Sequence, residues 1–151
     1  MRIWLDADGC PNDVKACVFK AAERTQTKVI LVADRWFRIP TSPLLELIVV
    51  NSGQDAADNY IVEQATPGDL IVTDDIPLAH RCVIKTLTTM SRRGIEFDER
   101  NIGERIATRD LMDSLRSTGM ITGGPAPYGP TDKKKFAETF DRLLQRLRNK
   151  K

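Results

Sequence analysis

Three pairs of aspartates in this chain have the chemistry to hold a divalent cation. Each pair follows shortly after an apolar run, and the pairs are Asp6 with Asp8, Asp55 with Asp58, and Asp74 with Asp75. Asp6 and Asp8 lie two residues apart in an extended segment, and Asp55 and Asp58 lie three apart on a helix, so the carboxylates of each of these pairs share one face. The same spacing of two residues holds for Thr73 and Asp75. Carboxylates gathered in one place repel one another unless a cation lies among them. Hard ions such as Mg²⁺ and Mn²⁺ prefer oxygen ligands, so the pattern predicts a metal-dependent enzyme.

Local structure offers a second explanation for the same aspartates. Asp75 precedes Ile76 and Pro77, where it could cap a helix, and Asp55 could cap the helix that contains Asp58. Three pairs converging on one edge of a sheet would be a poor structural device without a counter-charge. The joint pattern therefore favours a metal site over capping alone.

Alternating strands and helices are expected to position these side chains. The apolar pattern predicts strands at 2–6, 28–33, 46–50, 69–73 and 94–97, and helices at 12–24, 55–65, 77–90, 104–118 and 132–149. Continuous apolar strands indicate a parallel sheet covered on both faces. We therefore expect an α/β three-layer sandwich with a mostly parallel sheet of about five strands and a helical C-terminal extension. Right-handed crossovers allow the ends of the first and fourth strands to lie side by side.

Composition indicates one domain over residues 1–151. The chain is 41% hydrophobic and 29% charged, which is enough apolar material for one core. No apolar run approaches the roughly 20 residues that a membrane span needs, and no secretory signal is recognisable at the start. The three cysteines, Cys10, Cys17 and Cys82, lack metal-finger spacing and predict reduced thiols in the cytoplasm. Cys10 is interpreted as small buried filler, with a redox-sensitive thiol as the alternative.

Basic residues and a glycine-rich loop point to an anionic ligand. Residues 119–151 combine a Gly/Pro-rich loop with a basic helix, and residues 132–151 carry a net charge of +5 against −3 for the rest. A basic tail beside an acidic site fits an anionic substrate such as nucleic acid, and a solubilising helix end explains the same charges. The region after the fourth strand also contains several arginines suited to phosphate contact, namely Arg92, Arg93, Arg100, Arg105, Arg109 and Arg116.

The turn after the last of these arginines is a candidate for substrate binding. Arg116 is followed by Thr122, Gly123 and Gly124, whose backbone amides could bind a phosphate. A tight turn that needs positive φ explains the glycines equally well.

Several segments resemble a known bacterial family. They are Asp-Ala-Asp-Gly-Cys-Pro at 6–11, Asp-Ala-Ala-Asp-Asn-Tyr-Ile at 55–61, the stretch 68–79 with its Thr-Asp-Asp-Ile-Pro, Leu-Arg through Gly at 115–119, and Thr-Gly-Gly-Pro at 122–125. Together they resemble the YaiI/YqxD family over residues 2 to about 140. That family is similar in fold to the PIN-domain nucleases, so the resemblance implies a PIN-like domain.

The resemblance also implies roles for individual residues. PIN-like nucleases carry an aspartate at the end of the first strand, one near a helix start and one in a Thr-x-Asp, which match Asp6, Asp58 and Asp75. These three would bind Mg²⁺ or Mn²⁺ and act in catalysis with the help of Asp8. Secondary positions are Asp55, Thr73 and Asp74. The implied reaction is hydrolysis of a phosphodiester in RNA or another nucleic acid by metal-activated water.

Two other functions remain open at this stage. Asp6-Ala7-Asp8-Gly9 resembles the nucleophile motif of haloacid dehalogenase-type phosphatases, in which the first aspartate becomes phosphorylated. Such an enzyme also needs a Ser or Thr and a Lys, for which the candidates are Thr41, Ser42 and Lys85. A non-catalytic RNA-binding or regulatory module is the other alternative, and it predicts salt-dependent binding without turnover.

Overall fold

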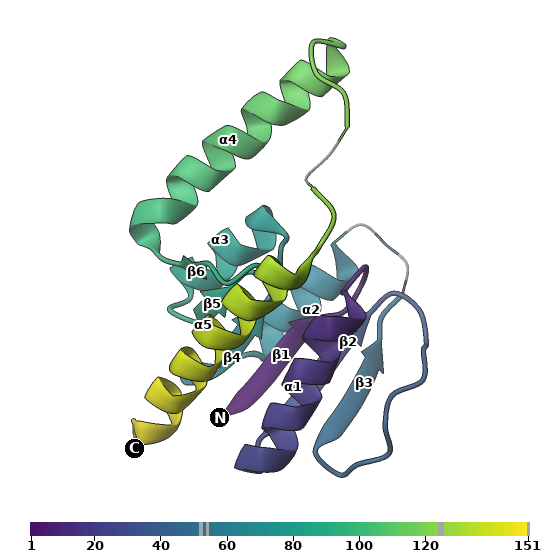
Figure 1. Ribbon diagram of the computed structural model, residues 1–151, viewed down its shortest axis with the longest axis vertical. Helices are drawn as coiled ribbons and strands as arrows, with labels where there is room; N and C mark the ends of the chain where they lie inside the picture. The colour runs from purple at the N-terminus through teal and green to yellow at the C-terminus, as the bar shows by residue number, and fades with distance from the viewer. Residues whose placement is uncertain (52, 54, 124–125, 151) are drawn as a thin grey trace.

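A six-stranded sheet covered by helices on both faces forms the body of the protein (Figure 1). The computed structural model describes residues 1–51, 53, 55–123 and 126–150. The strands are β1 (Arg2–Asp6), β2 (Lys28–Ala33), β3 (Leu45–Val49), β4 (Leu70–Val72), β5 (Thr88–Met90) and β6 (Glu96–Phe97). The helices are α1 (Asn12–Thr25), α2 (Ala56–Gln64), α3 (Ile76–Ile84), α4 (Glu99–Ser117) and α5 (Pro130–Asn149).

The strand order is β3-β2-β1-β4-β5-β6, with every pairing parallel except that of β5 with β6. The order along the chain reverses between β1 and β4. In doubly wound sheets ligands bind outside the carboxyl ends of the strands at such a switch point. The loops that follow β1 and β4 are therefore the first place to look for chemistry.

Two apolar layers hold the helices against the sheet. On one face Ile3 and Leu5 of β1 pack with α1 and with Phe136 and Phe140 of α5. On the other face Trp4 packs with the apolar sides of α2 and α3. Successive side chains of a strand point to opposite faces, so both sets come from one continuous apolar run. The predicted three-layer α/β sandwich with its C-terminal helix is confirmed.

Most predicted elements lie within a residue or two of their observed positions. The strands at 2–6 and 28–33 are confirmed residue for residue, and β1 pairs with β4 as expected. The predicted helix at 77–90 is wrong beyond Ile84. Thr86 adopts a left-handed backbone conformation, with φ of 63°, and the chain then enters β5 as a sixth strand. The β-branched pair Thr88 and Thr89 favours a strand there.

Helix α4 begins earlier than predicted because Asp98 caps it. The Asp98 carboxylate accepts hydrogen bonds from the backbone N–H groups of Arg100 and Asn101, both at 2.8 Å, and the Asn101 side chain accepts from the Asp98 N–H at 2.9 Å. This capping box fixes the first turn at Glu99. Among the described residues, no helix combines the length and apolar character needed to cross a membrane.

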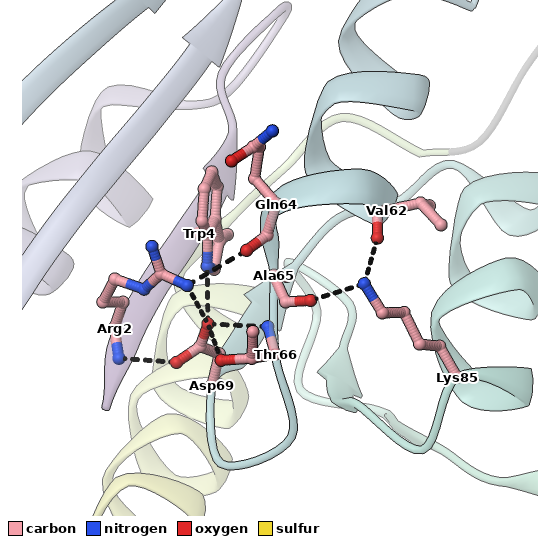
Figure 2. Close-up of polar contacts among 8 residues, drawn as sticks. All are labelled: Arg2, Trp4, Val62, Gln64, Ala65, Thr66, Asp69 and Lys85. Atoms are coloured by element: carbon pink, nitrogen blue, oxygen red, sulfur yellow. Dashed lines mark hydrogen bonds and ion pairs between the residues drawn. The ribbon is translucent and has the colours of Figure 1, made fainter.

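Polar groups at the amino edge of the sheet form a closed structural network (Figure 2). The buried Asp69 carboxylate accepts hydrogen bonds from the Arg2 backbone N–H at 2.9 Å, from the Trp4 indole at 3.0 Å and from the Thr66 N–H at 3.0 Å. Nearby, the Lys85 ammonium donates to the Ala65 carbonyl at 2.7 Å and to that of Val62. These bonds tie the starts of β1 and β4 to the ends of α2 and α3.

Candidate functional site

A cavity of about 350 Å³ opens at the carboxyl edge of the sheet. Seven aspartates line it: Asp6, Asp8, Asp34, Asp55, Asp58, Asp74 and Asp75. Arg92 lines it as well. The structure therefore brings all three predicted aspartate pairs into one cavity and adds Asp34. Its position, beside the ends of β1 and β4, is the switch point of the sheet.

Asp6 is the most enclosed of these carboxylates and is held by Thr73. It ends β1 and is 9% exposed. Its Oδ2 accepts a hydrogen bond from the Thr73 hydroxyl at 2.7 Å, and that hydroxyl accepts from the Asp75 backbone N–H at 3.0 Å. Burial raises the pKa of Asp6, and the bond from Thr73 opposes that rise. Thr73 therefore fixes the carboxylate of β1 relative to the loop after β4.

The two aspartates after β4 have different local partners. Asp75 caps α3, since its Oδ1 accepts from the Leu78 N–H at 3.1 Å, so the predicted capping role is confirmed. The same side chain lines the cavity, so capping does not account for all of its position. Asp74 accepts from the Arg92 N–H at 2.7 Å and thereby joins the loops after β4 and β5.

Asp58 shows the effect of crowding like charges most clearly. It lies half-buried in the first turn of α2, and its pKa is raised to about 6. Burial is the largest cause, followed by the negative charges of Asp75, Asp6 and Asp55. Asp55 occupies the N-cap position, with φ of 64°, but its side chain makes no capping hydrogen bond. The predicted side-chain cap by Asp55 is therefore wrong, and this carboxylate faces the cavity with the others.

Asp34 was missed by the sequence analysis. It follows β2 and belongs to the same type of position as the predicted pairs, namely an aspartate shortly after an apolar run. Its backbone N–H donates to both carboxylate oxygens of Asp8, at 3.1 and 3.2 Å. Asp8 is thus held on the side of the cavity that β2 provides.

Arg92 supports the floor of the cavity. It is 8% exposed, in contrast to the solvated arginine that the sequence allowed. Its guanidinium donates to the carbonyls of Asp6 at 2.6 Å, Asp8 at 2.9 Å and Gly9 at 3.3 Å. Within the described part of the chain its Nε has no hydrogen-bond partner. Arg92 therefore fixes the loop after β1 and has one buried N–H group that is not used in doing so.

Cys10 lies next to this loop and behaves as a buried apolar residue. It is 8% exposed, and burial raises the pKa of its thiol to about 11, against the opposing charge of Arg92. A thiol with so high a pKa is a weak nucleophile at neutral pH. The interpretation of Cys10 as buried filler is confirmed.

The predicted phosphate-binding turn lies elsewhere. Arg116 is near the end of α4, which extends away from the sheet (Figure 1), and it binds Asp113 and the Gly123 carbonyl at 3.3 and 3.0 Å. Neither Arg116 nor Thr122 nor Gly123 lines the acidic cavity. Gly123 has φ of 84°, which fits a turn, and Gly124 lies outside the described residues. Substrate binding by this turn stays a prediction.

The donor chemistry of the cavity fits a hard divalent cation. Asp6, Asp58 and Asp75 supply carboxylate oxygens, the ligands that Mg²⁺ and Mn²⁺ prefer. Across residues 1–51, 53, 55–123 and 126–150, however, no three His, Cys, Asp or Glu side chains are already arranged around a common ion position. A cation held by three of these carboxylates would need other side-chain rotamers than those of this structure.

The three residues named as candidates for phosphatase chemistry, Thr41, Ser42 and Lys85, do not gather here. Lys85 binds carbonyls at the opposite edge of the sheet (Figure 2), and Ser42 donates to Glu23 at 2.8 Å. Neither Lys85 nor Ser42 nor Thr41 lines the acidic cavity. None of these three candidates therefore lies beside the carboxylates; the hydroxyl that does is that of Thr73, which donates to Asp6.

Comparison with known proteins supports the family resemblance. The model of the family described as "Uncharacterized BCR, YaiI/YqxD family" matches residues 4–146. A UPF0178 protein of Pseudomonas fluorescens (strain Pf0-1) is 50% identical over 147 residues, which is 97% of this chain and 97% of the relative. A UPF0178 protein of Trichlorobacter lovleyi is 48% identical over 147 residues, covering 97% and 96% of the two chains. No solved structure matches the chain.

Proposed function

This chain belongs to the YaiI/YqxD family, and we propose that it is a metal-dependent phosphodiesterase that cleaves nucleic acid, RNA in particular, in the acidic cavity. The observation that carries the proposal is the gathering of seven aspartates at the switch point of the sheet. Seven carboxylates and one guanidinium, that of Arg92, give the cavity a large excess of negative charge, and a bound cation would lower the repulsion among them. The match of Asp6, Asp58 and Asp75 to the aspartate pattern of PIN-like nucleases supports the same proposal.

Asp6, Asp58 and Asp75 are the residues proposed to hold Mg²⁺ or Mn²⁺. They come from β1, α2 and the loop after β4, so an ion among them joins three elements of the fold. Such an ion lowers the pKa of a bound water and neutralises charge that develops on a phosphate. Thr73 keeps Asp6 in place through its 2.7 Å hydrogen bond. Asp8, fixed by the Asp34 N–H, lies beside them and assists in catalysis.

The charge of the cavity makes substrate binding dependent on the cation. Without an ion, a phosphate would enter a site whose one cationic side chain among the described residues, Arg92, already donates to three carbonyls. Repulsion between the phosphate and the carboxylates then opposes binding. A divalent ion bound among the carboxylates lowers this repulsion and offers the phosphate a cation to coordinate, so affinity for the substrate and rate of cleavage should rise together with the metal concentration. We further propose that the enzyme acts in the cytoplasm, where its three free thiols stay reduced.

Cleavage of fluorescently labelled single-stranded RNA and DNA tests the proposal. We expect cleavage with Mg²⁺ or Mn²⁺, none with EDTA, and a loss of at least about 100-fold in Asp6→Asn, Asp58→Asn and Asp75→Asn. Asparagine can still accept the capping hydrogen bond at position 75. The matched control is Asp13→Asn, an exposed carboxylate in the first turn of α1, which should leave activity unchanged.

Cleavage that persists in EDTA, or in all three variants, would overturn the assignment. Phosphate trapped covalently on Asp6 would instead identify the phosphatase chemistry. Salt-dependent binding of RNA without turnover under any metal condition would identify a non-catalytic module.

A further inference from the structure

A second cavity adjoins the acidic one and has a different character. Its volume is about 410 Å³, and its lining consists of Ala7, Asp8, Gly9, Cys10, Lys15, Asp34, Arg35 and Phe37. Asp8 and Asp34 line both cavities, so the two meet at these side chains. A ligand longer than one phosphate can therefore extend from the acidic cavity directly into the second one.

The far wall of the second cavity is cationic and aromatic. Lys15, on α1, places its ammonium 4.6 Å from the centre of the Phe37 ring. Arg35 follows β2, its side chain is 83% exposed, and its Nε lies 3.4 Å from the Asp34 carboxylate. This ion pair offsets the charge of Asp34 at the boundary between the cavities. The wall thus offers two cations for a phosphate and one ring for a flat apolar group.

Trp36 is a second aromatic residue in the segment that contributes Arg35 and Phe37 to this wall. It lies between Arg35 and Phe37 in the chain and is 73% exposed, which is unusual for so large an apolar side chain. Phe37 is partly buried against the core, so its ring has a fixed position. Unpaired bases stack on such rings, and the interaction is worth roughly 1–3 kcal/mol per base.

We propose that the second cavity binds the nucleotide next to the cleaved phosphodiester, with its base against Phe37 and Trp36 and its phosphate near Lys15 and Arg35. The proposal deepens the proposed function and rests on it for the position of the cleaved bond. It names single-stranded nucleic acid as the substrate class, because a base held in a duplex cannot stack on a protein ring. A cavity of this volume suits one small-molecule-sized unit rather than a double helix.

Binding of an oligonucleotide is the test, and Trp36 supplies the signal. The chain has two tryptophans, and Trp4 is 1% exposed in the core, so quenching by a stacked base reports on Trp36. The probe is a single-stranded RNA of about eight nucleotides, which is added stepwise to the protein. Ca²⁺ replaces Mg²⁺ in the buffer to limit cleavage. Single-stranded DNA and a duplex of the same sequence serve for comparison. We expect saturable quenching by both single strands, with weaker binding of the duplex.

Two variants separate the proposed contacts from general effects. Lys15→Ala and Phe37→Leu should each raise Kd, and KM for cleavage, by about tenfold, which corresponds to one lost phosphate or stacking contact. The matched control is Lys20→Ala, which removes a lysine from the same helix. Lys20 lines the groove between α1 and α5 and not the second cavity. It should leave Kd unchanged. Lys15→Ala keeps the test valid should Phe37→Leu unfold the protein.

The outcomes distinguish this inference from the proposed function. Unchanged Kd and KM in Lys15→Ala, together with metal-dependent cleavage that Asp58→Asn abolishes, would overturn the second cavity as a nucleotide site and leave the phosphodiesterase standing. Binding that depends on Lys15 without any metal-dependent cleavage would support the nucleotide site and overturn the phosphodiesterase. Duplex binding as tight as that of the single strand would contradict the substrate class.

Discussion

The raised pKa of Asp58 predicts a pH-dependent gain in stability when its charge is removed. The folded pKa is about 6, against an ordinary value of 3.8, because of burial and the neighbouring charges of Asp75, Asp6 and Asp55. The folded state therefore holds the proton more tightly than the unfolded state does. Above pH 6 the ionised Asp58 carboxylate lowers the free energy of unfolding by the full amount. This destabilisation shrinks as the pH falls from 6 to 4, and it is absent below the pKa of the unfolded state.

The size of the effect follows from the shift. Two pKa units correspond to about 3 kcal/mol at 1.36 kcal/mol per unit. Because Asp58 is only half-buried, solvent screens the charges, and we expect roughly half of that value, about 1–1.5 kcal/mol. Asp58→Asn keeps the size of the side chain and removes the charge. The variant should be more stable than the wild type by this amount at pH 8 and equal to it within a few tenths of a kcal/mol at pH 4.

Urea denaturation without divalent cations measures both free energies. Asp13→Asn, at an exposed position, is the control and should change stability little at either pH. Added Mg²⁺ should stabilise the wild type more than Asp58→Asn, because a bound cation relieves the repulsion that the variant has already removed. A variant that gains nothing at pH 8, or gains as much at pH 4 as at pH 8, would refute the argument from burial and charge crowding.

Other parts of the fold give further predictions. Asp69→Ala should lower the free energy of unfolding by about 3–5 kcal/mol, because it leaves the buried Trp4 indole and nearby backbone donors unpaired. A loss under about 1 kcal/mol in urea denaturation would show that this hydrogen-bond network does not stabilise the fold. Gly94→Ala should destabilise the protein by more than about 2 kcal/mol, because φ is 86° and the new Cβ would lie 2.5 Å from a backbone oxygen of α5. Gly103 on α4 faces open space, so Gly103→Ala should instead raise the free energy of unfolding by about 0.5–1 kcal/mol. Calorimetry measures both glycine variants, and a Gly94→Ala protein more stable than Gly103→Ala would refute the packing described for Gly94.

The central strands were readable from sequence because local pattern and tertiary burial agree there. Residues 2–6 and 28–33 are continuous apolar runs, and β1 and β2 are buried on both faces. The strand β5 was not readable, since the apolar spacing of residues 78–90 fits one long helix as well as a helix and a strand. In the structure the left-handed residue Thr86 separates the helix from the strand, and the spacing of apolar residues does not mark that position.

The residues of the candidate site likewise differ in whether the sequence alone could predict them. Six of its seven aspartates were found because they follow apolar runs, a rule that sequence alone can apply and that Asp34 obeys as well. The role of Arg92 could not be found in this way, because its carbonyl partners Asp6 and Asp8 lie more than eighty positions away along the chain. The place of Arg116 likewise depends on the direction in which α4 leaves the body, which no local pattern specifies.

Direct titration with Mn²⁺, with the free ion followed by electron paramagnetic resonance, tests the central claim that the clustered aspartates form a cation site. We expect saturable binding by the wild type, weakened at least about tenfold in Asp6→Asn, Asp58→Asn and Asp75→Asn and unchanged in Asp13→Asn. Absence of saturable binding, or binding that these three substitutions leave untouched, would contradict it.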